Sequence, residues 1–261
     1  MPLRTTIIFL LLLMILVFVF LMDILLGSIQ IPIQKIFSVI LTNHHDGYSE
    51  IIWQFRLPKA LTATLVGSSL AVSGLLMQTL FKNPLADPYV LGISSGASLG
   101  VALLIMASGA SWIPIFMVTS GWGQIFAAII GALLILMLVL LFSTRINDTV
   151  SLLIVGMMFG SITGALVNVL QSITNPDALK IFVIWTMGSL SAVSWEYMYI
   201  MFPMLFAGLL ISLLLPKQLN ALLLGENYAK SIGVTVFRLR FIIILVTCLL
   251  AGAATAFTGP I

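Results

Sequence analysis

The stretch Gln124-Ile-Phe-Ala-Ala-Ile-Ile-Gly-Ala-Leu-Leu-Ile-Leu-Met-Leu-Val-Leu-Leu-Phe142 decides the fold class. It contains no charged residue, and a helix of about 20 apolar residues crosses the hydrocarbon core of a bilayer. A strand of a membrane barrel would alternate polar and apolar residues, which this stretch does not do. We therefore expect a membrane-spanning helix here.

The same pattern recurs along the chain, which is 61% hydrophobic and only 7% charged. A soluble domain contains about 25% charged residues, so this composition excludes one. Seven stretches qualify as spans: residues 7–26, 61–81, 90–106, 124–142, 150–170, 197–215 and 241–257. We interpret the first as a retained span and not as a signal peptide, because no small-x-small cleavage site follows it.

An eighth apolar piece, residues 181–190, is too short to span and predicts a helix that lies at the membrane surface or re-enters from it. We expect residues 1–261 to form a single all-α transmembrane domain. The last residues, from Ala254 to Ile261, directly follow an apolar run, which suggests that the sequence is a fragment of a longer protein.

The positions of Lys and Arg predict the orientation in the membrane. With a cytoplasmic N-terminus, more of them lie inside than outside, as the positive-inside rule requires. The inside residues are Arg4, Lys82, Arg145, Lys217, Lys230, Arg238 and Arg240, and the outside residues are Lys35, Arg56, Lys59 and Lys180. Because they are scattered singly between apolar runs, they indicate membrane boundaries and not a nucleic-acid surface.

Two sets of glycines predict close helix packing. The sets are Gly92, Gly96 and Gly100, and Gly156, Gly160 and Gly164. Residues four apart share one helix face, and the missing side chains let another backbone approach closely. The pattern predicts a tight bundle, but it does not distinguish a transporter from other membrane bundles.

The sequence contains none of the catalytic motifs that we looked for. It contains no Gly-rich phosphate loop, no His-Glu-x-x-His and no Gly-x-Ser-x-Gly. The run His44-His45-Asp46 favours a solvated loop over a metal site, because adjacent loop residues seldom converge on one ion. We therefore predict no catalytic residue, metal or cofactor.

Apart from Asp23, the predicted spans also contain no Asp, Glu, Lys, Arg or His. Proton-coupled carriers generally place such groups at membrane depth, so these spans offer no proton relay. An external energy source, such as a partner ATPase, is the simpler inference. Sodium coupling through backbone carbonyls remains an alternative.

A polar stripe lies at the end of the fifth span. Asn168, Gln171 and Asn175 are three and four residues apart, on the face of Gly160 and Gly164. They would line a passage for a polar solute. The alternative is that the end of this helix is simply solvated.

The segment between the sixth and seventh spans, residues 216–236, predicts a short amphipathic helix. Leu219, Leu222 and Leu223 would share one face, and the helix would end near Gly233. On the cytoplasmic side such a helix would dock in the groove of a partner. Alternatively, it would lie on the lipid surface.

Three motifs together resemble a known family. The first runs from Arg56-Leu-Pro-Lys-Ala-Leu to Gly74 and continues through Asn83-Pro-Leu-Ala-Asp-Pro88 and Leu91-Gly-Ile-Ser-Ser-Gly-Ala97. The others are Leu224-Gly-Glu-Asn-Tyr-Ala-Lys-Ser-Ile-Gly233 and Gly259-Pro-Ile261. They are similar to the iron-siderophore, haem and vitamin B12 permeases of binding-protein-dependent ABC importers, and the likeness covers nearly all of the chain from Arg56 onward.

The resemblance implies a transmembrane bundle of the vitamin B12 permease type, in which about seven of about ten spans are present. It implies import of a ferric siderophore, haem or cobalamin through the cytoplasmic (inner) membrane. The implied partners are ABC ATPase subunits on the cytoplasmic side, a solute-binding protein on the other side, and a second permease copy or a paired homologue.

The resemblance also implies roles for single residues. Arg56 and Lys59 would meet glutamates of the binding protein, although Lys59 stands where the family has an arginine and loses its bidentate fork. The alternative is that both are interfacial charges that snorkel. In residues 216–236, the implied coupling loop, the residues that would transmit closure of the ATPases are Gly225, Glu226, Ala229 and Gly233.

The start of the fifth span, at Thr149, resembles the cytoplasmic gate of the family, although Val150 stands where relatives have a hydroxyl. Two other classes of protein remain as alternatives. An ion-coupled secondary transporter or channel would transport without a partner. A membrane-embedded enzyme would need catalytic groups outside this sequence.

Overall fold

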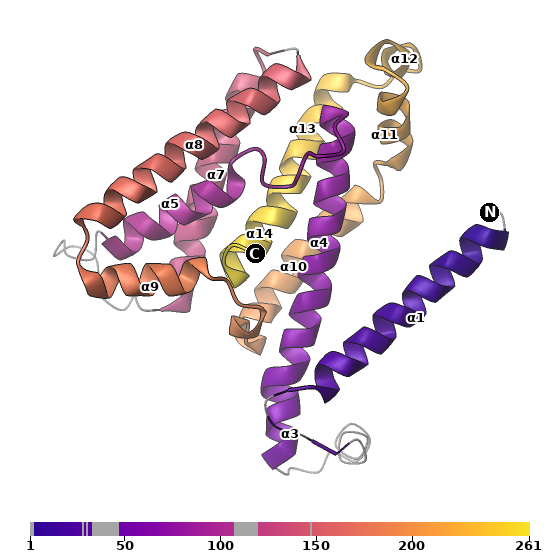
Figure 1. The fold of residues 1–261 in the computed structure, drawn as a ribbon. Helices are drawn as coiled ribbons and strands as arrows, with labels where there is room; N and C mark the ends of the chain where they lie inside the picture. Colours follow the sequence, from indigo (N-terminus) through magenta and orange to yellow (C-terminus); the bar gives the residue numbers. More distant parts are fainter. Residues whose placement is uncertain (1–2, 28, 30, 33–46, 107–119, 147) are drawn as a thin grey trace. The chain divides into compact units, whose positions relative to one another are not determined.

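The computed structural model describes residues 3–27, 29, 31, 32, 47–106, 120–146 and 148–261. All regular elements within these residues are helices (Figure 1). They divide into two compact units, one formed by residues 1–65 and 190–198 and the other by residues 66–189 and 199–261. The predicted all-α fold is confirmed.

The first unit packs the end of one helix against the start of another. It contains α1 (Leu3–Leu25), α3 (Gly47–Ile51), the π-helical segment η1 (Ile52–Arg56), the start of α4 (Leu57–Phe81), the 3₁₀ turn η3 (Leu190–Ala192) and the start of α10 (Trp195–Ser212). Its buried core is formed by Ile24, Ile31, Ile52 and Ala60. The indole N–H of Trp195 donates a hydrogen bond to the carbonyl oxygen of Trp53.

The second unit contains the rest of α4 and α10 and the remaining helices. These are α5 (Ile93–Met106), α7 (Gly121–Ser143), α8 (Thr149–Ile173), α9 (Pro176–Thr186), α11 (Pro216–Leu223), α12 (Glu226–Ser231), α13 (Val236–Thr247), the π-helical segment η4 (Cys248–Gly252) and α14 (Ala253–Thr258). Helix α5 packs against both α7 and α8 (Figure 1).

Six helical runs in the described residues are long and apolar enough to cross a membrane. They are Leu3–Leu25, Gly47–Phe81, Gly121–Ser143, Thr149–Ile173, Trp195–Ser212 and Val236–Thr258. These match six of the seven predicted spans.

The third predicted span is shorter than expected, because α5 has only 14 residues. Before it, the side chains of Asn83 and Asp87 accept hydrogen bonds from the backbone N–H groups of Leu85 and Tyr89, which favours turns over helix. Residues 181–186 of the short apolar piece belong to a short helix, α9, which has 11 residues and ends at Thr186. Its placement at the membrane surface stays a prediction.

The glycine sets pack closely at most positions. A Cβ atom on Gly96 would lie 2.7 Å from the carbonyl oxygen of Gly131 on α7, and one on Gly100 would overlap the backbone of Ala127. A Cβ atom on Gly156 of α8 would lie 3.0 Å from the Cα atom of Leu91. Because these glycines have no side chain, α5 can approach α7 closely and the turn at Leu91 can approach α8 closely.

Gly92 and Gly164 differ from the other glycines of the two sets. Gly92 lies before α5 in a turn with a φ of +79°, not on the helix face, although a Cβ there would still lie 3.0 Å from the amide nitrogen of Gly160. Among the described residues, no neighbour lies within 4 Å of the Cβ position of Gly164. Close packing at Gly164 therefore stays a prediction, whereas Gly156 and Gly160 contact the turn at Leu91 and Gly92.

Candidate functional site

The segment after α10 forms two short helices, α11 and α12, and not the single helix expected from the sequence. Gly225 separates them with a φ of +125°, and Gly233 follows α12 with a φ of +87°. Residues with a Cβ atom rarely adopt such angles, so both glycines shape the chain here.

The buried face of α11 also differs from the prediction. Leu219 and Leu222 are buried as expected, whereas Leu223 is exposed. Helix α11 ends at Leu223, and the chain then turns at Gly225 towards α12. Leu223 is thus an exposed residue at the end of α11 and does not share the buried face of Leu219 and Leu222.

Four apolar residues of this segment are exposed, and we call them together the exposed loop surface. Its residues are Leu223, Leu224, Tyr228 and Ile232, with exposed fractions of 55%, 70%, 48% and 55%. By contrast, Ala229 is fully buried. Leu224, Tyr228 and Ile232 belong to the family motif, but the roles implied by the resemblance fell on other residues of it. Sequence reasoning therefore missed the exposed side chains, because an apolar residue in this loop gives no sign of whether it is buried or exposed.

Arg240 connects three segments of the second unit. Its Nη2 atom lies 3.3 Å from Oε1 of Glu226 at the start of α12. Its Nη1 atom donates a hydrogen bond of 3.0 Å to the carbonyl oxygen of Ile146, between α7 and α8. Arg240 is only 5% exposed, and a buried charge is tolerated where it is paired and hydrogen-bonded. The predicted coupling residue Glu226 thus makes a contact inside the protein.

A cavity of about 80 Å³ lies beside this network. Its lining residues are Leu80, Lys82, Thr149, Leu222, Glu226, Val236 and Arg240. Thr149 and Glu226, which the sequence identified through separate motifs, therefore line the same cavity. From the sequence, Lys82 and Arg240 were interpreted only as charges at a membrane boundary, because nothing in their local sequence indicates that they line one cavity.

Asp148 caps the helix that begins at Thr149. Its carboxylate accepts hydrogen bonds from the Oγ and the backbone N–H of Ser151, at 2.7 and 2.8 Å. The bond from the Ser151 hydroxyl, together with the backbone bonds and the positive charge of Arg240, lowers the pKa of Asp148 below its usual value. The hydrogen bonds from Ser151 are the main cause of the lowered pKa of Asp148, and the charge of Arg240 contributes less.

Arg56 and Lys59, the predicted docking residues, both bind to the end of α1. The Nη1 atom of Arg56 donates hydrogen bonds to the carbonyl oxygens of Ile24 and Leu25 at 2.7 and 2.9 Å, and Nη2 donates to that of Ile29. The Nζ atom of Lys59 lies 2.8 Å from Oδ1 of Asp23. Arg56 is 7% exposed. Arg56 thus donates hydrogen bonds to backbone carbonyl oxygens at and just after the end of α1. Docking of the binding protein by Arg56 or Lys59 stays a prediction.

The predicted polar stripe is divided between two helices. Asn168 and Gln171 lie on α8, but α8 ends at Ile173. The side chain of Asn175 accepts a hydrogen bond of 2.8 Å from the N–H of Ala178 and caps α9. Placing Asn175 on the face of α8 is therefore wrong, because the Asn-Pro pair begins a new helix. The pathway role of all three residues stays a prediction.

His44-His45-Asp46 lies outside the described residues. Within the part of the chain that the structure describes, no group of three or more His, Cys, Asp or Glu side chains could hold a metal ion.

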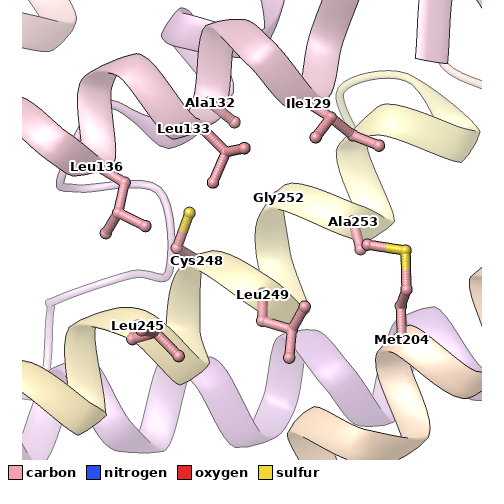
Figure 2. A pocket seen from close by; sticks show the side chains of 10 residues that line it. All are labelled: Ile129, Ala132, Leu133, Leu136, Met204, Leu245, Cys248, Leu249, Gly252 and Ala253. Atoms are coloured by element: carbon pink, nitrogen blue, oxygen red, sulfur yellow. The ribbon is translucent and has the colours of Figure 1, made fainter. Parts of the chain in front are cut away.

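A second cavity, of about 230 Å³, is apolar (Figure 2). Helices α7, α10, α13 and α14 and the segment η4 contribute its lining residues, which are Ile129, Ala132, Leu133, Leu136, Met204, Leu245, Cys248, Leu249, Gly252 and Ala253. Figure 2 shows the sulfur of Cys248 directed towards α7. None of these lining residues is charged, so the cavity offers no partner for a polar or charged solute.

The apolar helical runs and the close glycine crossings define the class of this chain: a multi-pass membrane protein.

Comparison with known proteins identifies the family. The sequence model of the FecCD transport family matches residues 14–261. The chain is 32% identical over 246 residues to the uncharacterized ABC transporter permease protein YvrB of Bacillus subtilis (strain 168), covering 90% of this chain and 68% of that protein. It is 35% identical over 237 residues to the hemin transport system permease protein HmuU of Yersinia pestis, covering 90% and 69%. The chain belongs to the FecCD transport family.

Further relatives agree with this assignment. The chain is 37% identical over 212 residues to the vitamin B12 import system permease protein BtuC of Klebsiella pneumoniae, covering 80% of this chain and 61% of that protein. A solved structure, described as an inward-facing conformation of a metal-chelate type ABC transporter, matches with a TM-score of 0.81 and 31% identity, covering 96% of this chain and 75% of that one. The resemblance seen in the sequence is confirmed, and the fold is that of an ABC transporter permease.

Proposed function

We propose that the chain is the permease subunit of an ABC importer that moves a metal chelate, namely a ferric siderophore, haem or cobalamin, delivered by a solute-binding protein. The observation that supports this most is the exposed loop surface on α11 and α12, which adjoins the cavity at Thr149. Relatives named for hemin and vitamin B12 transport support the class of solute.

The exposed loop surface would bind the ATPase subunit on the cytoplasmic side. Exposed apolar side chains grouped on a short polar loop are typical of a protein interface. The sequence contains no G-x-x-x-x-G-K-[ST] motif, so a partner would have to supply the nucleotide site. The short helices would dock in a groove of that partner.

The binding protein would dock on the opposite face of the membrane. Arg56 directly precedes α4 and Lys59 lies in its first turn, and this helix of 25 residues is long enough to cross a bilayer. The side chain of Lys59 is 39% exposed and Arg56 is buried. Lys59 is therefore the more accessible cation for an acidic partner. With the binding protein outside and the ATPase subunit inside, the N-terminus would be cytoplasmic and the protein would lie in the inner membrane.

A second permease copy, or a paired homologue, would complete the pathway. Asn168 is exposed and Gln171 is partly exposed on α8, so both are available to a polar solute between two copies. This proposal includes no metal or cofactor bound by the permease, and any metal would travel as part of the solute.

The test is uptake by proteoliposomes that contain the full complex. Labelled ferric siderophore, haem and cobalamin would be compared with and without ATP and with and without the binding protein. The proposal predicts that one solute accumulates only when both are present. Accumulation by the permease alone, driven by an ion gradient, would contradict the proposal and support a secondary transporter.

A pair of variants tests the contact with the ATPase. Tyr228→Ala removes an exposed aromatic side chain of α12, and Asn227→Ala changes its exposed polar neighbour. We expect Tyr228→Ala to weaken binding of the ATPase subunit about tenfold, as for an interface residue of moderate importance. Asn227→Ala should bind as the wild type does. Equal binding of the ATPase subunit by both variants would show that Tyr228 of α12 does not form the contact.

A further inference from the structure

The position of Arg240 suggests how a movement of the exposed loop surface reaches the predicted gate. Its guanidinium contacts Glu226 at the first position of α12 and the carbonyl oxygen of Ile146, which lies two residues before Asp148, the cap of α8. These partners are 14 and 94 positions away in the sequence. One side chain thus holds the loop helix and the start of α8 at the same time.

The chemistry of arginine suits this double contact. A guanidinium is planar, and its N–H donors point in fixed directions, so two partners bound to it keep a fixed relative position. The ammonium of lysine has a single nitrogen on a flexible stem and does not impose that geometry. Arg240 uses different nitrogens, Nη2 and Nη1, for its two partners.

The charges around Arg240 strengthen the contact. Glu226 lies 3.3 Å away, and the positive charge of Arg240 helps to lower the pKa of Asp148. Of the other cations, Lys230 lies 3.8 Å from the second carboxylate oxygen of Glu226 and is largely exposed, while Lys82 lines the same cavity. A buried arginine that lost its carboxylate would be an uncompensated charge, so the network resists separation of its parts.

We propose that Arg240 is a positioning residue that makes α12 and the first turn of α8 move as one body. Displacement of the exposed loop surface by the ATPase would then move Thr149 directly, without passing along the length of a membrane span. This inference rests on the proposed function and adds to it the route of coupling.

The first test measures solute uptake per ATP hydrolysed in proteoliposomes of the full complex. Arg240→Lys keeps the charge, and Arg240→Met keeps much of the length but not the charge. We expect the ratio to fall about tenfold for Arg240→Met, the size of effect of losing one charge-assisted hydrogen bond, and to fall less for Arg240→Lys. Arg238→Met, an exposed position on the same helix, should keep the wild-type ratio. A wild-type ratio in Arg240→Met would overturn the inference.

A charge exchange separates coupling from stability. The double variant Glu226→Arg with Arg240→Glu restores an ion pair between α12 and α13 but has no donor at position 240 for the carbonyl of Ile146. We expect it to recover the melting temperature lost by Glu226→Arg alone, but not the uptake ratio. Recovery of both would show that the contact with Ile146 is dispensable and would overturn the inference.

A distance measurement tests the joint movement without transport. Cys248 is the only cysteine, so spin labels can be placed at Asn227→Cys on α12 and Val150→Cys on α8 in a Cys248→Ser background. In the full complex, the distance between the labels should be the same with and without ATP when Arg240 is present, and should change with ATP in Arg240→Met. An equal change in both would overturn the inference. If the wild-type complex shows no ATP-dependent uptake, the proposed function fails, whereas this distance still tests the link.

Discussion

The guanidinium of Arg56 donates a hydrogen bond of 2.7 Å to the carbonyl oxygen of Ile24, 32 positions earlier in the sequence. Ile24 lies in the last turn of α1, where backbone carbonyls have no partner within the helix. A positive charge at this end of a helix also interacts favourably with its dipole. Arg56 therefore holds the end of the first span on the residues that begin α4, whatever else it binds.

The first prediction concerns this contact. Arg56→Met leaves the carbonyls of Ile24, Leu25 and Ile29 without their donor, and we expect the free energy of unfolding to fall by about 2 to 3 kcal/mol. Lys59→Met breaks a partly exposed ion pair with Asp23, and we expect a loss of about 0 to 1 kcal/mol. Denaturant unfolding in detergent micelles measures both. Equal losses would contradict the role of Arg56 at the helix end.

The second prediction compares two glycines of the bundle. A Cβ atom on Gly131 would overlap the carbonyl oxygen of Gly96, so Gly131→Ala should lower the stability by about 1 to 3 kcal/mol, as overpacking does. Gly164 has open space around its Cβ position, so Gly164→Ala should change the stability by about 1 kcal/mol or less. The two melting temperatures in detergent give the comparison. A large loss in Gly164→Ala would mean that another helix covers this face of α8.

The third prediction concerns the accessibility of Cys248. Its side chain lines the apolar cavity and is only 5% exposed, so a water-soluble maleimide should not modify it in native membranes. Ile232→Cys in a Cys248→Ser background places a thiol on the exposed loop surface and should react quickly. Labelling before and after denaturation in SDS measures both. Rapid labelling of native Cys248 would show that water enters the cavity.

The fourth prediction is a pH dependence. The pKa of Asp148 is lowered in the native protein from its ordinary value of 3.8. Its ionised form therefore stabilises the fold above that ordinary value, and the contribution disappears as the pH falls through the lower native pKa. Asp148→Asn keeps a capping side chain but removes the charge. We expect its melting temperature to lie below that of the wild type at pH 7 and to match it in strong acid.

A control separates the charge of Asp148 from its capping role. Asp148→Ala loses the bonds to Ser151 as well as the charge, so it should melt lower than the wild type at every pH. If Asp148→Asn also stayed lower in strong acid, its amide would not replace the carboxylate as a cap, and the charge would not explain the difference.

Local patterns predicted most of the fold. The apolar runs identified the spans because burying a backbone in lipid requires a helix of about 20 apolar residues. The third span was overestimated because residues 90–92 form a turn, in which Gly92 has a φ of +79°, and hydropathy does not register such a turn. Asn175 was placed on the wrong helix for the same kind of reason, since Asn-Pro both ends one helix and begins the next.

The candidate site was predicted only in part. The motif identified the loop of Gly225 and Glu226 and, separately, the helix start at Thr149, but not that Glu226 and Thr149 line one cavity with Arg240. Arg240 and Ile146 are 94 positions apart, and no spacing rule connects residues so far apart on different helices. Likewise, Leu223 was assigned to the buried face because its exposure depends on where α11 ends.

The sequence by itself determined that this chain enters a membrane as a bundle of helices, because hydropathy and helical spacing are properties of neighbouring residues. Only the tertiary structure decided that Arg56 binds the end of α1 and that Arg240 joins α12 to the start of α8. The physical reason is that a helix specifies which side chains share its own face, whereas the partner of that face follows from packing all the helices at once.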